Sequence, residues 1–125
     1  MTPLRLIFAG SGEFGLPTLK RLIADGHDIV RVFTQPDRPA GRGRKLTPTP
    51  IAAFAASAGL SVTPTADINA EPAVDADAMV VIAFGQKLSQ EVTGRPRLGS
   101  VNLHASRVPQ YRGAAPINWA VINGE

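Results

Sequence analysis

Short apolar runs alternate along the chain with segments in which apolar residues recur at close to helical spacing. The apolar runs predict strands at residues 4–9, 29–33, 61–63, 78–84 and 100–103. The run at 78–84 is apolar throughout, which is typical of a strand that is covered on both faces of a sheet. These strands supply the candidate core of the protein.

Apolar residues at helical spacing predict helices at 13–24 and 51–58. Gly26 and Gly59 follow these segments, and glycine is common just past the C-terminus of a helix. Residues 116–122 are expected to begin a further helix. The regular alternation of strand and helix favours an α/β fold with a mostly parallel sheet and right-handed crossovers.

The composition narrows the class of protein. At 125 residues and 13.2 kDa the chain has the length of one domain, and 44% hydrophobic with 18% charged residues is typical of a globular protein. The absence of cysteine excludes disulfide scaffolds, thiolate zinc sites and cysteine nucleophiles. The longest apolar run, residues 78–84, is far shorter than the roughly 20 residues of a membrane helix. We therefore expect no membrane partner and a cytoplasmic location.

Positive charge is concentrated in the proline- and glycine-rich segment 36–50. Four basic residues and Asp37 give this segment a local net charge of +3, so the rest of the chain is nearly neutral. The basic residues are Arg38, Arg42, Arg44 and Lys45. Such a cluster is typical either of a loop that binds a phosphate backbone or of a solvated surface loop, and the cluster alone does not distinguish the two.

Residues 10–15 read GSGEFG, which matches the glycine pattern of dinucleotide-binding turns between a strand and a helix. In such sites the second strand ends in an acidic residue that binds ribose hydroxyls. Here that strand ends in Phe33, Thr34 and Gln35 instead. We therefore interpret the glycines as the geometry of a tight turn rather than as a dinucleotide site.

Asn102 and His104 lie at the end of the predicted strand 100–103. Residues two apart on a strand share a face, so the amide and the imidazole are expected side by side at the edge where α/β sheets bind ligands. An amide N–H stabilises an oxyanion, and an imidazole moves protons near neutral pH. The pair suits acyl transfer, although a structural histidine and a turn-capping asparagine remain the alternative for the pair alone.

Several longer motifs resemble one known family. The segment 104–119, HASRVPQYRGAAPINW, resembles the signature of the formyltetrahydrofolate-dependent formyltransferases. Within it 111–117, together with NGE at 123–125, is similar to the branch of that family that formylates methionyl-tRNA. The segment 33–46 resembles the basic loop of the family, and FGQKL at 84–88 resembles its Phe-Gly loop beside the folate. The resemblance implies a mostly parallel, Rossmann-like sheet of the formyltransferase type.

The resemblance also implies roles for individual residues. In the family, the asparagine corresponding to Asn102 stabilises the oxyanion and the histidine corresponding to His104 transfers protons. Arg107 and Val108 stand where the family usually has two leucines, which leaves contacts through the backbone. The positions that correspond to the folate site are Phe84, Gly85, Gln86, Ser106, Arg107, Val108 and Pro109.

The implied reaction transfers a formyl group from 10-formyltetrahydrofolate to the α-amine of initiator methionyl-tRNA in translation initiation, and it needs no metal. The basic residues that correspond to the tRNA-binding loop are Arg38, Arg42, Arg44 and Lys45. Guanidinium groups suit this role because they pair bidentately with phosphates.

The family continues beyond the position of Glu125, with an aspartate that orients the histidine, the rest of the catalytic domain and a β-barrel domain. We therefore expect residues 1–125 to be a partial N-terminal formyltransferase domain, incomplete at the C-terminal end of its sheet. Two further functions remain open. One is a formyltransferase that acts on a small amine, which would not require the basic loop. The other is a fragment that binds tRNA or folate without turnover.

Overall fold

The computed structural model of the chain describes residues 2–41, 43, 45–105 and 117–121. Its central feature is a sheet whose strands lie in the order β5-β2-β1-β6-β7-β8 within this part of the chain. The strands are β1 Arg5–Gly10, β2 Asp28–Thr34, β5 Val62–Pro64, β6 Ala78–Ile82, β7 Ser100–Ala105 and β8 Ile117–Val121. All neighbouring pairs are parallel except β7 with β8, so the prediction of a mostly parallel α/β sheet is confirmed.

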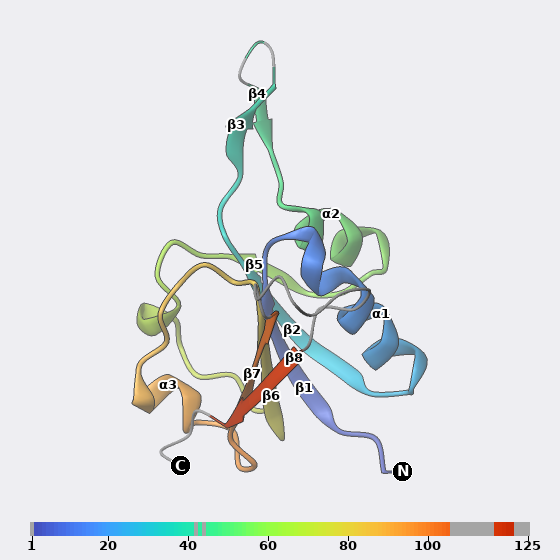
Figure 1. Cartoon of the computed structure of the whole chain (residues 1–125), viewed down its shortest axis with the longest axis vertical. Helices are drawn as coiled ribbons and strands as arrows, with labels where there is room; N and C mark the ends of the chain where they lie inside the picture. The colour runs from blue at the N-terminus through green and yellow to red at the C-terminus, as the bar shows by residue number, and fades with distance from the viewer. Residues whose placement is uncertain (1, 42, 44, 106–116, 122–125) are drawn as a thin grey trace, which may run out of the picture.

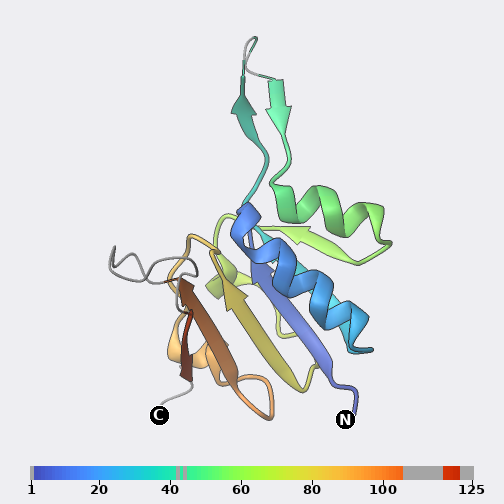
Figure 2. The same ribbon diagram turned by 45° about the vertical axis from the view of Figure 1, so that its right-hand side comes forward.

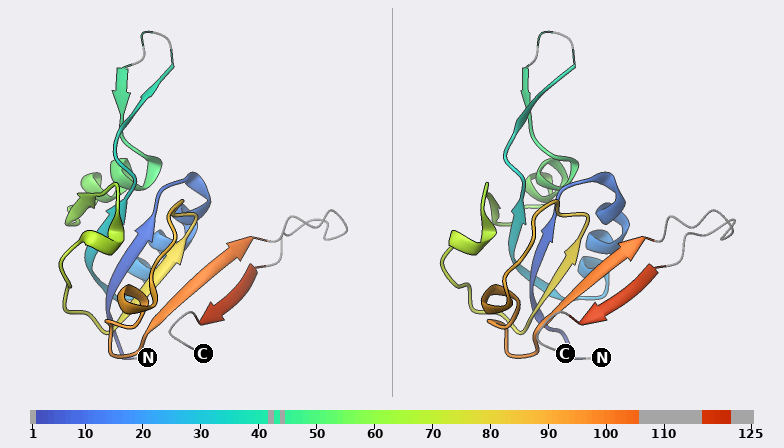
Figure 3. Two further views of the ribbon diagram at one scale, coloured as in Figure 1. Left: turned by 90° about the vertical axis from the view of Figure 1, so that its left-hand side faces the viewer. Right: turned by 60° about the vertical axis from the view of Figure 1, so that its left-hand side comes forward.

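Helices cover both faces of the sheet. On one face lie α1, Leu16–Ala24, and α2, Pro50–Ser57, which pack on one core through Leu19 and Ile51. On the other lie the short elements η3, Ile68–Ala70, and α3, Gln90–Thr93, which contribute to a second core. Figure 2 looks onto the face covered by α1 and α2, and Figure 3 shows η3 and α3 on the opposite face.

The side chains of β1 alternate between these two cores. Leu6 and Phe8 belong to the core under α1 and α2, whereas Ile7 and Ala9 belong to the core under η3 and α3. All four are at most 5% exposed. This period of two, with apolar residues on both faces, explains why the central strands read as continuous apolar runs.

The strand order reverses between β1 and β6. The chain moves outward from β1 to β2 and β5, then crosses back to place β6 and β7 on the other side of β1. The carboxyl ends of β1 and β6 therefore lie side by side where the connections diverge, as the register Gly10↔Ile82 shows. In open α/β sheets this reversal point is the place where ligands bind.

A hairpin interrupts the segment predicted as a basic loop. Its strands are β3, Arg38–Ala40, and β4, Lys45–Thr47, which pair antiparallel with Arg38 opposite Thr47. Figure 1 shows the hairpin projecting away from the sheet, beyond the carboxyl ends of β1 and β2. The described residues of both strands are exposed, so the hairpin contributes nothing to the core.

The helix predicted at residues 116–122 is wrong where the structure describes it. Residues 117–121 form β8, which pairs antiparallel with β7, for example Asn102 with Ala120. Branched and aromatic residues alternate with small or polar ones along β8, at Ile117, Trp119 and Val121. A period of two is a strand signal, although so short a segment fits helical spacing about equally well.

Two smaller differences concern boundaries. The strand predicted at 78–84 ends at Ile82, because Ala83 turns into the left-handed region at φ 49°. The short helices η3 and α3 were not predicted, since neither has a full turn of periodic apolar residues. No described helix has the length and apolar character needed to cross a membrane.

Candidate active site

Asn102 lies in β7 opposite Val81 of β6, near the carboxyl end of the sheet. It is partly exposed and lines an open hollow of about 390 Å³. The other residues around this hollow are Val81, Ala83, Phe84, Gly85, Gln86 and Lys87. None of the described residues hydrogen-bonds to the Asn102 amide, so its N–H groups remain available to a ligand. The structure thus brings Asn102 together with the predicted folate positions 84–86.

His104 lies two residues further along β7, with its backbone opposite Asn118 of β8. That the side chains of residues 102 and 104 share one face of the sheet stays a prediction from their spacing on a strand. The side chain of His104 is outside the described part of the structure, and so are all of Ser106, Arg107, Val108 and Pro109. Their roles remain predictions.

The loop after β6 has an unusual backbone that other elements hold in place. Ala83 has φ 49° and Gly85 has φ 91°, both in the left-handed region. The backbone N–H groups of Ser11 and Gly12 donate to the Ala83 carbonyl at 3.1 and 3.4 Å, and the Ser11 hydroxyl donates to the Phe84 carbonyl at 3.0 Å. A left-handed alanine persists only where its surroundings over-determine it, and these three hydrogen bonds meet that need.

The phenyl ring of Phe84 is buried in the core. It is 3% exposed and packs in the core under η3 and α3. Gly85 lies against the side chain of Gln35, since a Cβ on Gly85 would sit 2.8 Å from Gln35 Nε2. These two residues can therefore contribute mainly backbone groups to the hollow, rather than an aromatic stacking surface.

The side chain of Gln86 is engaged within the protein. Its Nε2 donates to Gln35 Oε1 at 3.0 Å and to the Thr65 carbonyl at 2.8 Å, while its Oε1 accepts from the Ile68 N–H at 2.9 Å. Both amide hydrogens are thereby used. Gln86 therefore holds the loop after β6 against the end of β2 and against η3. The sequence analysis did not predict this structural role.

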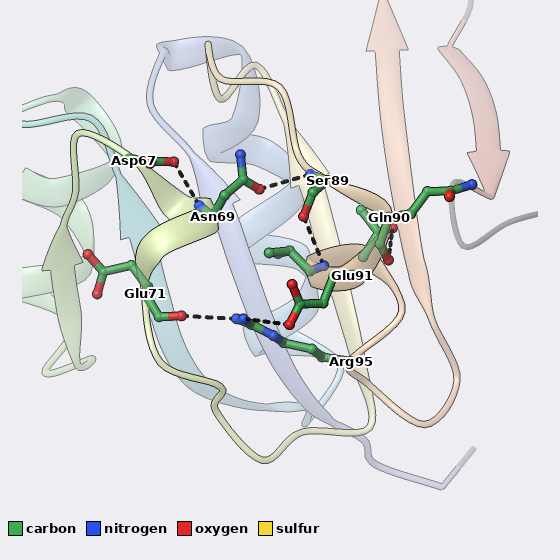
Figure 4. Close-up of polar contacts among 9 residues, drawn as sticks. Asp67, Asn69, Glu71, Ser89, Gln90, Glu91 and Arg95 are labelled. Atoms are coloured by element: carbon green, nitrogen blue, oxygen red, sulfur yellow. Dashed lines mark hydrogen bonds and ion pairs between the residues drawn. The ribbon is translucent and has the colours of Figure 1, made fainter.

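Asn69 of η3 supports the same loop further along. Its Nδ2 donates to the Lys87 carbonyl at 3.0 Å, and its Oδ1 accepts from the Ser89 N–H at 2.8 Å. Ser89 in turn caps α3 by accepting from the Val92 N–H at 3.2 Å. Figure 4 shows the Asn69 and Ser89 contacts, with Arg95 joining α3 to the Glu71 carbonyl below them. The loop around the hollow is thus fixed at both ends.

A second open hollow of about 540 Å³ adjoins the first. It lies between the base of the hairpin and the ends of β1 and β6, and it shares Ala83, Phe84 and Gly85 with the first hollow. Arg38 and Thr47 line its hairpin side. One loop therefore separates the predicted folate positions from the predicted RNA-binding hairpin.

The basic residues of the hairpin lie where a large ligand can reach them. Arg38 and Lys45 are exposed, and neither forms an ion pair with any residue that the structure describes. Leu46 beside them is 65% exposed. Arg42 and Arg44 lie outside the described residues.

The first turn uses its polar groups internally. The N–H groups of Ser11 and Gly12 already donate to the Ala83 carbonyl, so they are not free for a pyrophosphate. A Cβ on Gly10 would sit 2.8 Å from the Ile82 carbonyl oxygen, which explains glycine there as close packing of β1 on β6. These contacts support the tight-turn interpretation. Within the described residues, no group of three or more histidine, cysteine or carboxylate side chains could hold a metal ion.

The chain matches a known family along almost its whole length. Residues 4–125 match the formyl transferase family, and the chain belongs to this family. The family resemblance predicted from the motifs is thereby confirmed.

Three relatives named methionyl-tRNA formyltransferase are similar to the chain along nearly all of its length. The protein of Geobacter metallireducens is 48% identical over 131 residues, which cover 100% of this chain and 42% of that protein. The protein of Nitrobacter winogradskyi is 49% identical over 129 residues, which cover 98% of this chain and 41% of that protein. The protein of Methylococcus capsulatus is 47% identical over 128 residues, which cover 98% of this chain and 42% of that protein. The chain thus spans about two fifths of the length of the curated relatives it matches.

Proposed function

We propose that this chain forms the N-terminal part of the catalytic domain of an enzyme that formylates initiator methionyl-tRNA in the cytoplasm, with 10-formyltetrahydrofolate as formyl donor. The observation that carries the proposal is the position of Asn102. Its amide, which has no hydrogen-bond partner among the residues that the structure describes, lines a hollow at the carboxyl end of β7, beside the Phe84–Gly85–Gln86 loop. The similarity to three methionyl-tRNA formyltransferases points to the same reaction.

The first hollow suits a folate-sized ligand in volume and chemistry. Ligand sites usually measure 300–1,000 Å³ and combine apolar walls with a few fixed polar groups. Here the walls come from Val81 and Ala83, and the polar groups are the loop backbone and the Asn102 amide. Ser106, Arg107, Val108 and Pro109, which follow β7, would complete the wall. The bound folate supplies the activated formyl group.

Formyl transfer requires help at the formyl oxygen and at the attacking amine. Asn102 Nδ2 would donate a hydrogen bond to the formyl oxygen as negative charge develops there, because a fixed amide stabilises charge best where water is excluded. His104 would take up the proton that the attacking α-amine loses, a task that suits an imidazole near neutral pH. No step of this kind needs a metal ion in the chain.

The hairpin favours an RNA acceptor over a small amine. Arg38 and Lys45 are exposed without ion-pair partners among the described residues, and Arg42 and Arg44 lie between them in the sequence. Exposed basic side chains on a projecting two-stranded ribbon suit contacts with the phosphates of an RNA backbone. A small amine would make no use of a ribbon that points away from the sheet.

The test is formyl transfer from 10-formyltetrahydrofolate to methionyl-tRNA, followed as acid-precipitable label. It should be run with this chain and with a chimera in which the chain replaces the matching part of the Geobacter metallireducens protein. We expect the chimera to formylate methionyl-tRNA and to lose that activity with Asn102→Ala. A chimera that is folded by circular dichroism but formylates only small amines, or nothing, would refute the proposal. Activity of the chain alone would show that downstream residues are dispensable.

A further inference from the structure

One serine hydroxyl joins the loop of the first hollow to the base of the hairpin. Ser11 Oγ donates to the Phe84 carbonyl at 3.0 Å and accepts from the Gln35 N–H at 3.1 Å. A longer contact of 3.5 Å links it to the hydroxyl of Thr34. Ser11 follows β1 directly, so it stands at the reversal point of the strand order, between the two hollows.

The hairpin is anchored at both of its ends to this same point. Its outgoing arm begins with Gln35, three residues before β3, and its returning arm ends at Thr49, two residues after β4. Thr49 Oγ1 lies 2.6 Å from Thr34 Oγ1 and accepts from the Ala52 N–H at 3.0 Å, capping α2. Thr34 is fully buried, so this contact is shielded from water.

Three hydroxyls lie in contact in this cluster, those of Ser11, Thr34 and Thr49. Each hydroxyl has a single hydrogen, and that of Ser11 is used on the Phe84 carbonyl. Either hydroxyl of Thr34 and Thr49 can be the donor in their 2.6 Å contact, and the 3.5 Å contact from Thr34 to Ser11 is at the outer limit of a hydrogen bond. The result is a polar chain from the cap of α2 to the loop of the first hollow. Hydrogen bonds in such a chain polarise one another, and a fully satisfied network is rigid.

Gln35 makes a second connection between the hairpin and the loop. Its Oε1 accepts from Gln86 Nε2 at 3.0 Å, and its side chain packs against Gly85. The loop that receives these contacts is held away from its relaxed shape, since Ala83 has φ 49°. Because hydrogen bonds hold this strained loop in place, the loop responds when one of them is tightened or released.

We propose that Ser11 is a positioning residue that couples the two ligands of the site, so that RNA on the hairpin and a formyl-folate in the first hollow bind cooperatively. The inference rests on the proposed function for the identity of both ligands. RNA that fixes the hairpin also fixes Gln35 and Thr49, and through Ser11 it fixes the carbonyl of Phe84. The Phe84 carbonyl and the loop around it are then held in the position that the folate meets. By linkage, the folate strengthens RNA binding by the same factor.

The test is a thermodynamic cycle measured by titration calorimetry on the full chain. The probes are 5-formyltetrahydrofolate, which keeps its formyl group, and uncharged initiator tRNA. The Kd of each probe is measured alone and with the other probe saturating. We expect each Kd to fall by at least about 5-fold when the other ligand is present, the lower end of the range typical of coupled sites. In Ser11→Ala the ratio should fall to near one.

Two variants separate positioning from general damage. Ser11→Thr keeps a hydroxyl at position 11 and is expected to keep the coupling between the two ligands. Ser57→Ala removes a serine hydroxyl that also donates to a backbone carbonyl, that of Phe54 at 2.7 Å, but on the exposed surface of α2. It should leave both the affinities and their ratio unchanged. Thermal unfolding of each variant checks that the fold is intact.

The possible results distinguish failure of the coupling from failure of the proposed function. If both probes bind but neither changes the Kd of the other, the coupling is refuted and the proposed function stands. Coupling that survives in folded Ser11→Ala refutes the role of Ser11. If neither probe binds the chain or the chimera, the proposed function fails and this inference fails with it.

Discussion

The side-chain amide of Gln86 donates to Oε1 of Gln35 at 3.0 Å, although 51 positions separate the two residues in the sequence. The same amide donates to the Thr65 carbonyl and accepts from the Ile68 N–H. Gln86 therefore joins the loop after β6 to the end of β2 and to η3. This side chain holds in place the loop that lines the candidate site.

Replacing Gln86 by leucine should destabilise the protein. Ile68 and Thr65 are almost fully buried, so the change leaves an N–H and a carbonyl without partners, at a cost of about 1–3 kcal/mol for each buried group. Urea unfolding at neutral pH measures the difference. The matched control is Gln90→Leu, at an exposed position of α3, which should change stability by less than about 0.5 kcal/mol. Equal stability of the two variants would show that the hydrogen bonds of Gln86 contribute nothing.

Ala83→Gly should stabilise the protein. Ala83 is exposed and has φ 49°, a conformation that costs an L-residue roughly 1–2 kcal/mol and glycine almost nothing. We expect a gain of about 1 kcal/mol, or a few degrees in Tm for a domain of this size. The same substitution at exposed Ala53 in α2 should lower stability by about 1 kcal/mol. Differential scanning calorimetry on both variants checks the opposite signs, and a fall in Tm for Ala83→Gly would contradict the strain.

Asn102→Ala should lower kcat for formyl transfer by about 10²–10³-fold, the usual effect of removing one oxyanion donor. The assay uses the chain, or the chimera if downstream residues are required. Asn102→Asp has the same shape but no N–H to donate, so its activity should fall at least as far. Folate affinity should change much less than kcat, because the developing charge is absent before reaction. A folded Asn102→Ala enzyme with nearly unchanged kcat would remove Asn102 from the mechanism.

Arg38→Gln and Lys45→Gln should each weaken tRNA binding and flatten its salt dependence. Removing one phosphate-binding charge reduces the slope of log K against log salt by about 0.7–0.9. Fluorescence titrations at several salt concentrations give the slope. Arg21→Gln is the matched control, since Arg21 is exposed on α1, remote from the hairpin, and paired with Asp25. An unchanged slope in both hairpin variants would mean that the hairpin does not bind RNA phosphates.

Much of the architecture could be predicted from the sequence because the sheet is buried on both faces. Residues 78–84 and 4–9 are continuous apolar runs, which predict strands that are covered on both faces. The parallel order of the strands was predicted from their alternation with helices. The hairpin at 38–47 could not be predicted in this way. Its exposed strands carry no apolar period, so the segment looked like a loop. Residues 117–121 were misread because five residues fit a strand and a helix about equally well.

The candidate site shows the same division. The position of Asn102 followed from strand geometry, and the Phe84–Gly85 loop followed from a family resemblance. Phe84 and Gln86 nevertheless differ from what their predicted role suggested, because the ring is in the core and the amide is used internally. Long-range hydrogen bonds such as that from Gln86 to Thr65 leave no trace in local sequence. They decide which groups remain available to a ligand.

Asp77 directly precedes β6, at the amino end of the strands, and predicts that the stability of the protein depends on pH. The Arg5 N–H donates to Asp77 Oδ2 at 2.8 Å, and Arg97 Nε donates to Oδ1 at 2.9 Å. The first of these hydrogen bonds, with help from Arg97, holds the pKa of the Asp77 carboxyl below its ordinary value of about 3.9. A carboxylate whose pKa is lower when folded than when unfolded stabilises the folded state above the unfolded pKa. That contribution disappears as the pH falls through the folded pKa.

Asp77→Asn should therefore be less stable than the natural protein at pH 7, and the difference should shrink as the pH falls below about 4. Urea midpoints at pH 7, 5, 4 and 3 measure the trend. Asp75→Asn is the control, because its carboxylate is 93% exposed and pairs with Arg5 only at the surface. Such a pair contributes about 0–1 kcal/mol, so its removal should have a small effect at every pH. A difference for Asp77→Asn that is constant from pH 7 to 3 would show that the stabilisation comes from the shape of the side chain and not from its charge.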